Sequence, residues 1–202
     1  MVHLGFADSG LRPDPDVVPA APGPAAAPFV RADTEEAAAR LAAILREEQV
    51  DVLLGYDRNG GYGHPDHVKV HHVARRAAEL AGTSRLLEAT VPRDTICRAL
   101  DLAARVHRFP PDFDRAGFDT AFSARSEITH RIDVHRHIAA KRASMRAHAS
   151  QASADGGADR TLAALLRIPR PLYDLVFGRE WYVDPSGSPA SGVRTDVFDG
   201  LA

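Results

Sequence analysis

The alternation of helix-like and strand-like segments between residues 34 and 106 is the feature that most constrains the fold of this chain. Apolar spacing and capping residues predict helices at 34–48, 65–80 and 94–106. Short apolar runs predict buried strands at 50–55 and 85–91. This alternation indicates an α/β domain with a largely parallel sheet. Ligand sites in such sheets lie at the carboxyl ends of the strands.

The segments on either side of this region are less regular. Residues 12–32 are rich in proline, which disfavours both helices and central strands, so they predict a long irregular segment. After residue 106 the sequence predicts extended segments at 127–133 and 180–183, helices at 134–148, 160–167 and 171–177, and a flexible polar break at 153–159. Residues 1–184 are expected to form a single domain, followed by a disordered tail at 185–202.

Composition excludes several classes of function. The 202 residues carry a net charge of −2, which favours neither nucleic acid nor an anionic membrane as a partner. No apolar run approaches the roughly 18 residues that a membrane span needs. The single cysteine, Cys97, excludes a disulfide framework and a cysteine-rich zinc site. We therefore expect a soluble, cytoplasmic protein; its oligomeric state is not indicated.

The stretch NGGYGHPDH at 59–67 lies where a strand is predicted to pass into a helix. Its glycines allow a sharp turn and the close approach of a ligand. If Pro65 opens the helix, His64 and His67 both lie at its start. Imidazole binds zinc well, and a histidine can also stabilise an oxyanion or transfer a proton. The pattern is also typical of simple capping and turn chemistry.

Other histidines offer weaker alternatives. His67 and His71 have the i, i+4 spacing that can hold zinc on a helix, although solvated positions explain His71 and His72 more simply. His148 lies near a predicted helix C-terminus, which favours a cation, and His130, His135 and His137 have the character of solvated residues. A phosphate cradle is a further alternative, but the glycine spacing matches neither the dinucleotide fingerprint nor the P-loop.

Four stretches resemble the PIG-L/LmbE-like family of zinc-dependent de-N-acetylases, which includes N-acetylglucosaminyl-inositol deacetylases and mycothiol conjugate amidases. These are LGFADSGL at 4–11, DVLLGYDRNGGYGHPDHVKVHHVARRAA at 51–78, KRASMRAHASQ at 141–151 and FGREWYV at 177–183. The stretch NGGYGHPDH is the most specific of them. The resemblance implies a Rossmann-like (LmbE-like), mostly parallel sheet with flanking helices.

The resemblance also implies roles for particular residues. His67 would be a ligand of Zn²⁺, and His64 would stabilise the oxyanion or act as general acid. Asp66 would orient a histidine, Tyr62 would help to polarise the amide carbonyl, and Asp8 would bind a sugar hydroxyl. The implied reaction removes an N-acetyl group from an N-acetylglucosamine-type conjugate, a small-molecule amino-sugar substrate.

One family motif is missing from this sequence. Members of the family carry an early motif like AHPDDE, which supplies two further zinc ligands and a general base. No such motif occurs here, so the implied ligand set is incomplete and we expect an N-terminally truncated domain that lacks a βαβ portion. Asp8, Asp57 and His148 are conceivable substitutes as ligands. A non-catalytic binding module, or one that depends on a partner chain, is the alternative to a hydrolase.

Overall fold

The structure is a computed structural model that describes residues 2–10, 28–106, 108–109, 111, 113–148 and 166–201. The predicted break at 153–159, most of the predicted helix at 160–167 and residues 12–27 of the irregular segment lie outside the described residues. The chain divides into two compact units, which we describe separately. The first comprises 1–130 and 181–202, and the second comprises 131–180.

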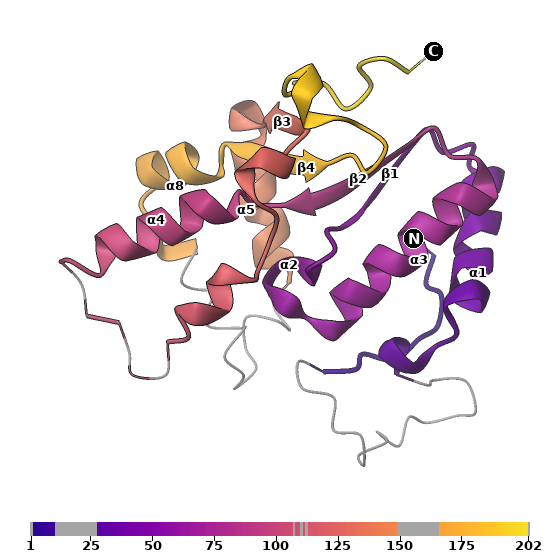
Figure 1. The fold of residues 1–202 in the computed structure, drawn as a ribbon, viewed down its shortest axis with the longest axis horizontal. Helices are drawn as coiled ribbons and strands as arrows, with labels where there is room; N and C mark the ends of the chain where they lie inside the picture. Colours follow the sequence, from indigo (N-terminus) through magenta and orange to yellow (C-terminus); the bar gives the residue numbers. More distant parts are fainter. Residues whose placement is uncertain are drawn as a thin grey trace. The chain divides into compact units, whose positions relative to one another are not determined.

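The sheet has four strands in the order β1-β2-β4-β3 (Figure 1). Their bounds are Val52–Tyr56 for β1, Arg85–Thr90 for β2, His130–Asp133 for β3 and Arg179–Val183 for β4. Strands β1 and β2 are parallel and in register from the pair Val52 and Arg85 to the pair Tyr56 and Ala89. The predicted α/β class is confirmed.

Strands β1 and β2 are parallel, whereas β4 runs antiparallel to β2. The reason lies in the connections. A helix carries the chain from β1 back to the start of β2, and such a crossover makes two strands parallel. Strand β4 follows the short helix Arg170–Phe177 directly, and the described part of the chain between β2 and β4 contains several helices and β3 rather than one crossover helix. The sheet is therefore mixed rather than mostly parallel.

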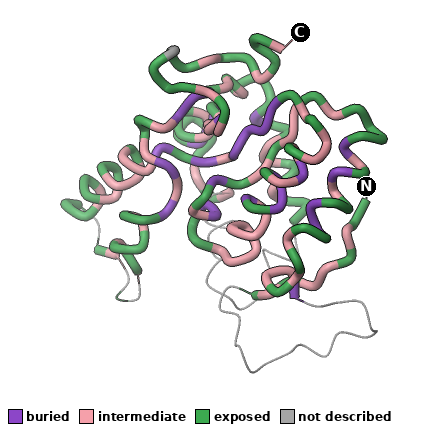
Figure 2. Tube along the Cα trace, turned by 45° about the vertical axis from the view of Figure 1, so that its right-hand side comes forward, coloured by how far each residue is buried: buried purple, intermediate pink, exposed green. Residues whose placement is uncertain are grey.

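Two helices, α1 (Thr34–Glu47) and α3 (Pro65–Ala81), pack together beside β1. Local sequence signals set their ends, as predicted: the Asp33 carboxylate accepts a hydrogen bond of 2.8 Å from the Glu36 N–H, and Gly82 ends α3 at φ +70°. Figure 2 shows buried positions along β2 and on the inward sides of these helices. The apolar core consists of Ala37, Ala38, Ala42, Leu45, Val73 and Ala77.

The remaining elements of the first unit are short. They are η1 (Phe29–Arg31), α2 (Gly60–Gly63), α4 (Arg93–Ala103), η2 (Ala116–Asp119), η3 (Arg125–Glu127) and η5 (Pro189–Ser191). The second unit contains η4 (His135–His137), α5 (Ile138–Ala147) and α8 (Arg170–Phe177). In that unit the Arg142 guanidinium lies 4.5 Å from the ring centroid of the buried Tyr173. No helix in the described ranges has the length and apolarity to cross a bilayer.

Described residues after 184, where we expected a disordered tail, form hydrogen bonds with residues of the first unit. The Arg194 N–H donates to the Thr129 carbonyl over 2.9 Å, and the Arg85 guanidinium donates to the Val197 carbonyl over 2.7 Å. Arg85 is buried, with one nitrogen 3.5 Å from the Asp184 carboxylate. The partners of these tail residues lie far away in the sequence, so local composition does not reveal them. The single domain at 1–184 stays a prediction.

His130 is buried at the start of β3, which corrects the expectation of a solvated side chain. It occupies the inward-facing position of the strand, and its Nδ1 lies 2.9 Å from the Thr129 hydroxyl. Burial is the main cause that lowers the pKa of His130, and the positive charges of Arg85 and Arg194 lower it further. The neutral form of the imidazole is therefore favoured in the folded state.

We expect this buried imidazole to make the protein less stable in acid. Below about pH 6.5, the ordinary pKa of histidine, the unfolded chain binds a proton at His130 that the folded chain does not. The free energy of unfolding should therefore fall as the pH drops, with a contribution of at most about 1.4 kcal/mol per pH unit. Urea unfolding between pH 5 and 7.5 measures this slope.

The variant His130→Gln should have a shallower slope, whatever its absolute stability. His137→Gln, which changes an exposed histidine of η4, serves as the control and should keep the wild-type slope. An unchanged slope in His130→Gln would show that His130 is not the group responsible.

Candidate active site at the carboxyl end of β1

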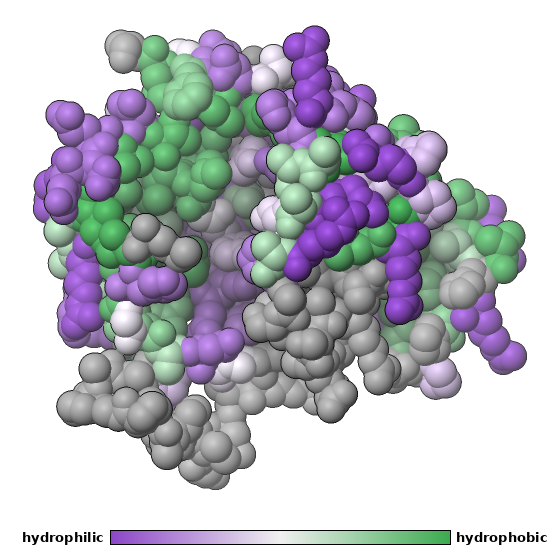
Figure 3. All heavy atoms as spheres, turned by 180° about the vertical axis from the view of Figure 1, so that it is seen from behind, coloured by the Kyte–Doolittle hydropathy of each residue, from purple (hydrophilic) through white to green (hydrophobic). Residues whose placement is uncertain are grey.

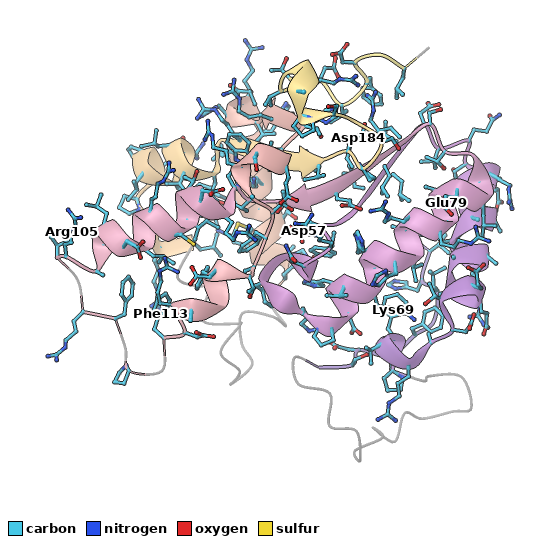
Figure 4. The ribbon with its side chains drawn as sticks, in the orientation of Figure 1. Asp57, Lys69, Glu79, Arg105, Phe113 and Asp184 are labelled. Carbon is cyan, nitrogen blue, oxygen red and sulfur yellow. The ribbon has the colours of Figure 1, made fainter. Side chains whose placement is uncertain are left out.

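The turn after β1 is built around the fully buried carboxylate of Asp57 (Figure 4). One oxygen accepts a hydrogen bond of 2.9 Å from the Gly61 N–H. The other accepts hydrogen bonds from the hydroxyls of Thr90 and Ser123. Since both oxygens have partners inside the protein, Asp57 supports the turn. This finding removes the basis for considering it as a substitute metal ligand.

Gly60 has a conformation and surroundings that suit only glycine. Its φ is +62°, in the left-handed region that side chains disfavour. A Cβ at this position would lie 2.8 Å from the backbone nitrogen of Val68 and 2.8 Å from its Cγ2. This close approach brings the backbone of the turn against the first residues of α3, and the Gly60 carbonyl against His67.

His64 is the N-cap of α3, and Pro65 is its first residue, as the sequence predicts. The Nδ1 of His64 accepts a hydrogen bond of 3.1 Å from the Asp66 N–H. One nitrogen of His64, Nδ1, therefore caps the helix, which is the simple capping role that the sequence also allowed. Because Nδ1 is an acceptor, the neutral ring carries its proton on Nε2, which can act as a donor.

His67 lies in the first turn of α3 and is held in its neutral form. Burial is the main cause that lowers its pKa, and a positive charge on the adjacent His64 lowers it further. Its Nδ1 lies 3.3 Å from the Gly60 carbonyl oxygen, to which it can donate. No hydrogen bond to Nε2 occurs in the described part of the chain. A neutral imidazole with one nitrogen bonded to a carbonyl and the other free is the usual form of a metal ligand.

The structure brings Tyr62, His64 and His67 together, as the motif predicts. The ring centroids of His64 and His67 are 4.7 Å apart. Tyr62 lies edge-on to both, with its centroid 6.1 Å from that of His64 and 5.3 Å from that of His67. The side chain of Tyr62 is half exposed, so the group of three rings is accessible from solvent.

Asp66 connects α3 to the segment that contains Asp8. One oxygen of Asp66 accepts a hydrogen bond of 2.9 Å from the Ser9 N–H, while the other is buried and lacks a hydrogen-bond partner among the described residues. The exposed Asp8 accepts a hydrogen bond of 2.7 Å from the Gly10 N–H. The negative charges of Asp66 and Asp8 act on His67 and partly offset the lowering of its pKa.

Two of the alternative histidines have structural partners. His71 is buried, not solvated as expected, because it faces β2, where its Nδ1 lies 3.0 Å from the Glu88 carboxylate. His148 follows α5 in the second unit, where its Nδ1 lies 2.8 Å from the Ser144 carbonyl. That contact agrees with the helix C-terminal interpretation of His148.

The described residues do not provide a complete metal site. No group of three or more His, Cys, Asp or Glu side chains within them could hold a metal ion. A catalytic zinc site normally has three protein ligands. The donor arrangement of His67 fits one ligand of such a site, and the described part of the chain does not supply the others.

The sequence did not single out Tyr56, which stacks on His67, or the supporting role of Asp57. A tyrosine and an aspartate at the carboxyl end of a predicted strand, just before the turn, are the only local signal for either role. A cavity of about 300 Å³ lies near the other end of β2 and is lined by none of the predicted site residues.

Fold and site together define an α/β domain with a histidine-bearing site at the carboxyl end of a parallel strand, the position at which such domains bind ligands. Residues 1–78, which include all the predicted site residues, match the family model described as PIG-L, GlcNAc-PI de-N-acetylase. The chain is therefore related to the PIG-L family, which confirms the resemblance seen in the sequence.

Similar proteins bear names that agree with this family. A protein of Streptomyces avermitilis is 38% identical over 192 residues, and one of Geodermatophilus obscurus is 31% identical over 194 residues. Both matches cover 86% of this chain, which spans 62% of the length of each relative. A protein of Salinispora arenicola is 42% identical over 130 residues, which are 61% of this chain and 42% of the relative. All three are named 1D-myo-inositol 2-acetamido-2-deoxy-alpha-D-glucopyranoside deacetylase.

Proposed function

We propose that this chain acts in a zinc-dependent hydrolase that removes the N-acetyl group from an N-acetylglucosamine-type amino-sugar conjugate. The observation that carries the proposal is the arrangement of His67, which is neutral, bonded through Nδ1 to the Gly60 carbonyl, and grouped with His64 and Tyr62. The names of the relatives support the same reaction and a small-molecule sugar substrate. A cytoplasmic location stays a prediction from the sequence.

The residues of the site have donors and acceptors that suit amide hydrolysis. His64, whose Nδ1 accepts from the Asp66 N–H, can donate a hydrogen bond from Nε2 to the oxyanion. The hydroxyl of Tyr62, a half-exposed residue, can donate to the amide carbonyl of the substrate. The exposed carboxylate of Asp8 can accept from a sugar hydroxyl.

His67 would hold the metal through Nε2 as one ligand of the site. A bound zinc ion supplies a polarised carbonyl and a water molecule of lowered pKa. The Gly60 carbonyl keeps the proton of His67 on Nδ1, and Asp66 adds negative charge close to this ring. Asp66 also holds the Asp8 segment against the start of α3 through the Ser9 N–H.

Acetate release from 1D-myo-inositol 2-acetamido-2-deoxy-alpha-D-glucopyranoside, measured with the purified chain and added Zn²⁺, tests this proposal. We expect turnover, and we expect His64→Ala to lower kcat by about 10²- to 10³-fold, because it removes a hydrogen-bond donor to the oxyanion. His137→Ala, which changes an exposed histidine of the second unit, should leave kcat unchanged. A folded chain that releases no acetate, or a fully active His64→Ala variant, would refute the proposal.

A non-catalytic module that binds a sugar or a partner chain is the second candidate. It is favoured by the incomplete ligand set and by β1, which pairs only with β2 in the described sheet and exposes 57% of Leu54. Figure 3 shows hydrophobic surface next to hydrophilic surface on the face opposite to that of Figure 1. This candidate predicts saturable binding of the same sugar conjugate with no acetate release, so the assay above separates the two.

A further inference from the structure

The last residue of β1, Tyr56, forms a parallel stack with His67. Their ring centroids are 3.9 Å apart, and their planes differ by 5°. Tyr56 does not belong to the apolar core of α1, α3 and β1, and it keeps an exposed fraction of 37%. Among the described residues, the closest aromatic partner of Tyr56 is therefore the imidazole at the candidate site, which gives this side chain a role distinct from core packing.

The hydrogen bond to Gly60 is not enough by itself to fix the imidazole. The Nδ1 to oxygen distance of 3.3 Å is longer than that of a typical N–H···O bond, so the bond is weak. The second side-chain torsion of histidine is broad, so the ring can rotate about it at low cost. A flat ring lying parallel to the imidazole removes that freedom, because rotation would break the stack.

We propose that Tyr56 is a positioning residue that fixes the imidazole plane of His67 and, together with the Gly60 carbonyl, holds it as the Nδ1–H tautomer with Nε2 free. The stack sets the plane of the ring, and the carbonyl selects which nitrogen carries the proton. The orientation of the His67 ring does not depend on the proposed function. The consequence for metal binding rests on the proposed function, in which Nε2 is the ligand atom.

The phenol ring, not its hydroxyl, carries this role. Among the described residues the Tyr56 hydroxyl makes no hydrogen bond, and burial raises its pKa, so the group is neutral near pH 7. Tyr56→Phe therefore keeps the stack and serves as the conservative variant, whereas Tyr56→Leu removes the flat ring and keeps an apolar side chain. Leu54→Ala, on the same strand and 57% exposed, serves as the control for a change in β1 outside the ring stack.

Long-range ¹H–¹⁵N NMR of the histidine rings at neutral pH, without metal, tests the proposal. The wild type, Tyr56→Phe and Leu54→Ala should show His67 as the Nδ1–H tautomer, with its ring protons shifted upfield by the aromatic neighbour. Tyr56→Leu should lose the upfield shift and give a mixture of tautomers. The proposal is overturned if folded Tyr56→Leu keeps the wild-type tautomer and shifts, or if Tyr56→Phe fails to restore them.

Titration of the same variants with Zn²⁺ provides the second readout. Tyr56→Leu should bind the ion about 10- to 100-fold more weakly than the wild type, as expected when a group that orients a ligand is lost, and Tyr56→Phe should match the wild type. Equal zinc affinity in Tyr56→Leu and the wild type would contradict the positioning role. If the NMR result is as expected but no variant releases acetate, the proposed function fails while the role of Tyr56 stands.

Discussion

Asp57→Ala should lower the free energy of unfolding by about 3 kcal/mol or more, because it leaves several buried donors without an acceptor. The carboxylate is fully buried and accepts hydrogen bonds from the Gly61 N–H and from the hydroxyls of Thr90 and Ser123. These three donors come from the turn, from β2 and from the segment before η3. Losing the shared acceptor therefore removes hydrogen bonds that link three parts of the first unit.

Urea unfolding, followed by circular dichroism, measures this effect. Asp57→Asn keeps one acceptor oxygen and should lose less stability than Asp57→Ala. Asp51→Ala, which changes an exposed aspartate just before β1, should stay within about 0.5 kcal/mol of the wild type. A loss in Asp57→Ala no larger than the loss in Asp51→Ala would show that the turn does not depend on this carboxylate.

Gly60→Ala should destabilise the protein by about 2–4 kcal/mol, because two costs combine at this position. A side chain is strained at φ +62°, and the added Cβ would lie 2.8 Å from the backbone nitrogen of Val68, so the turn must move away from α3. That movement should also withdraw the Gly60 carbonyl from His67. The ¹H–¹⁵N spectrum of His67 should then lose the Nδ1–H preference.

Gly63→Ala is the matched control for this prediction. Gly63 lies in the same turn and also has a positive φ, +93°, but a Cβ there would meet nothing within 4 Å. Gly63→Ala therefore introduces the backbone strain without a steric clash. The difference in the free energy of unfolding between the two variants then measures the contact with Val68. Equal stabilities, with an unchanged His67 spectrum in Gly60→Ala, would contradict the account of this turn.

Local signals in the sequence predicted the parts of the fold that local interactions determine. Asp33 caps α1, Pro65 opens α3 and Gly82 closes it, and each of these effects acts within one turn of helix. The grouping of Tyr62, His64 and His67 follows from the same turn, so the motif predicted it as well.

Contacts between distant residues were not predictable in this way. Asp57 meets Thr90, 33 residues away, and Ser123, 66 residues away, so its burial and support of the turn depend on the packing of the whole unit. The burial of His71 beside Glu88 depends on which face of α3 meets β2. The direction of β4 likewise depends on how the chain returns to the sheet, which no residue within the strand indicates.

The zinc content of the purified chain, measured by elemental analysis in the wild type and in His67→Ala, tests most directly the claim that this turn presents a metal ligand. We expect about one zinc per chain in the wild type and almost none in His67→Ala. His72→Ala, which changes an exposed histidine of the same helix, should keep the metal. A wild-type chain without zinc, or a His67→Ala variant that retains it, would contradict the assignment of His67 as a metal ligand.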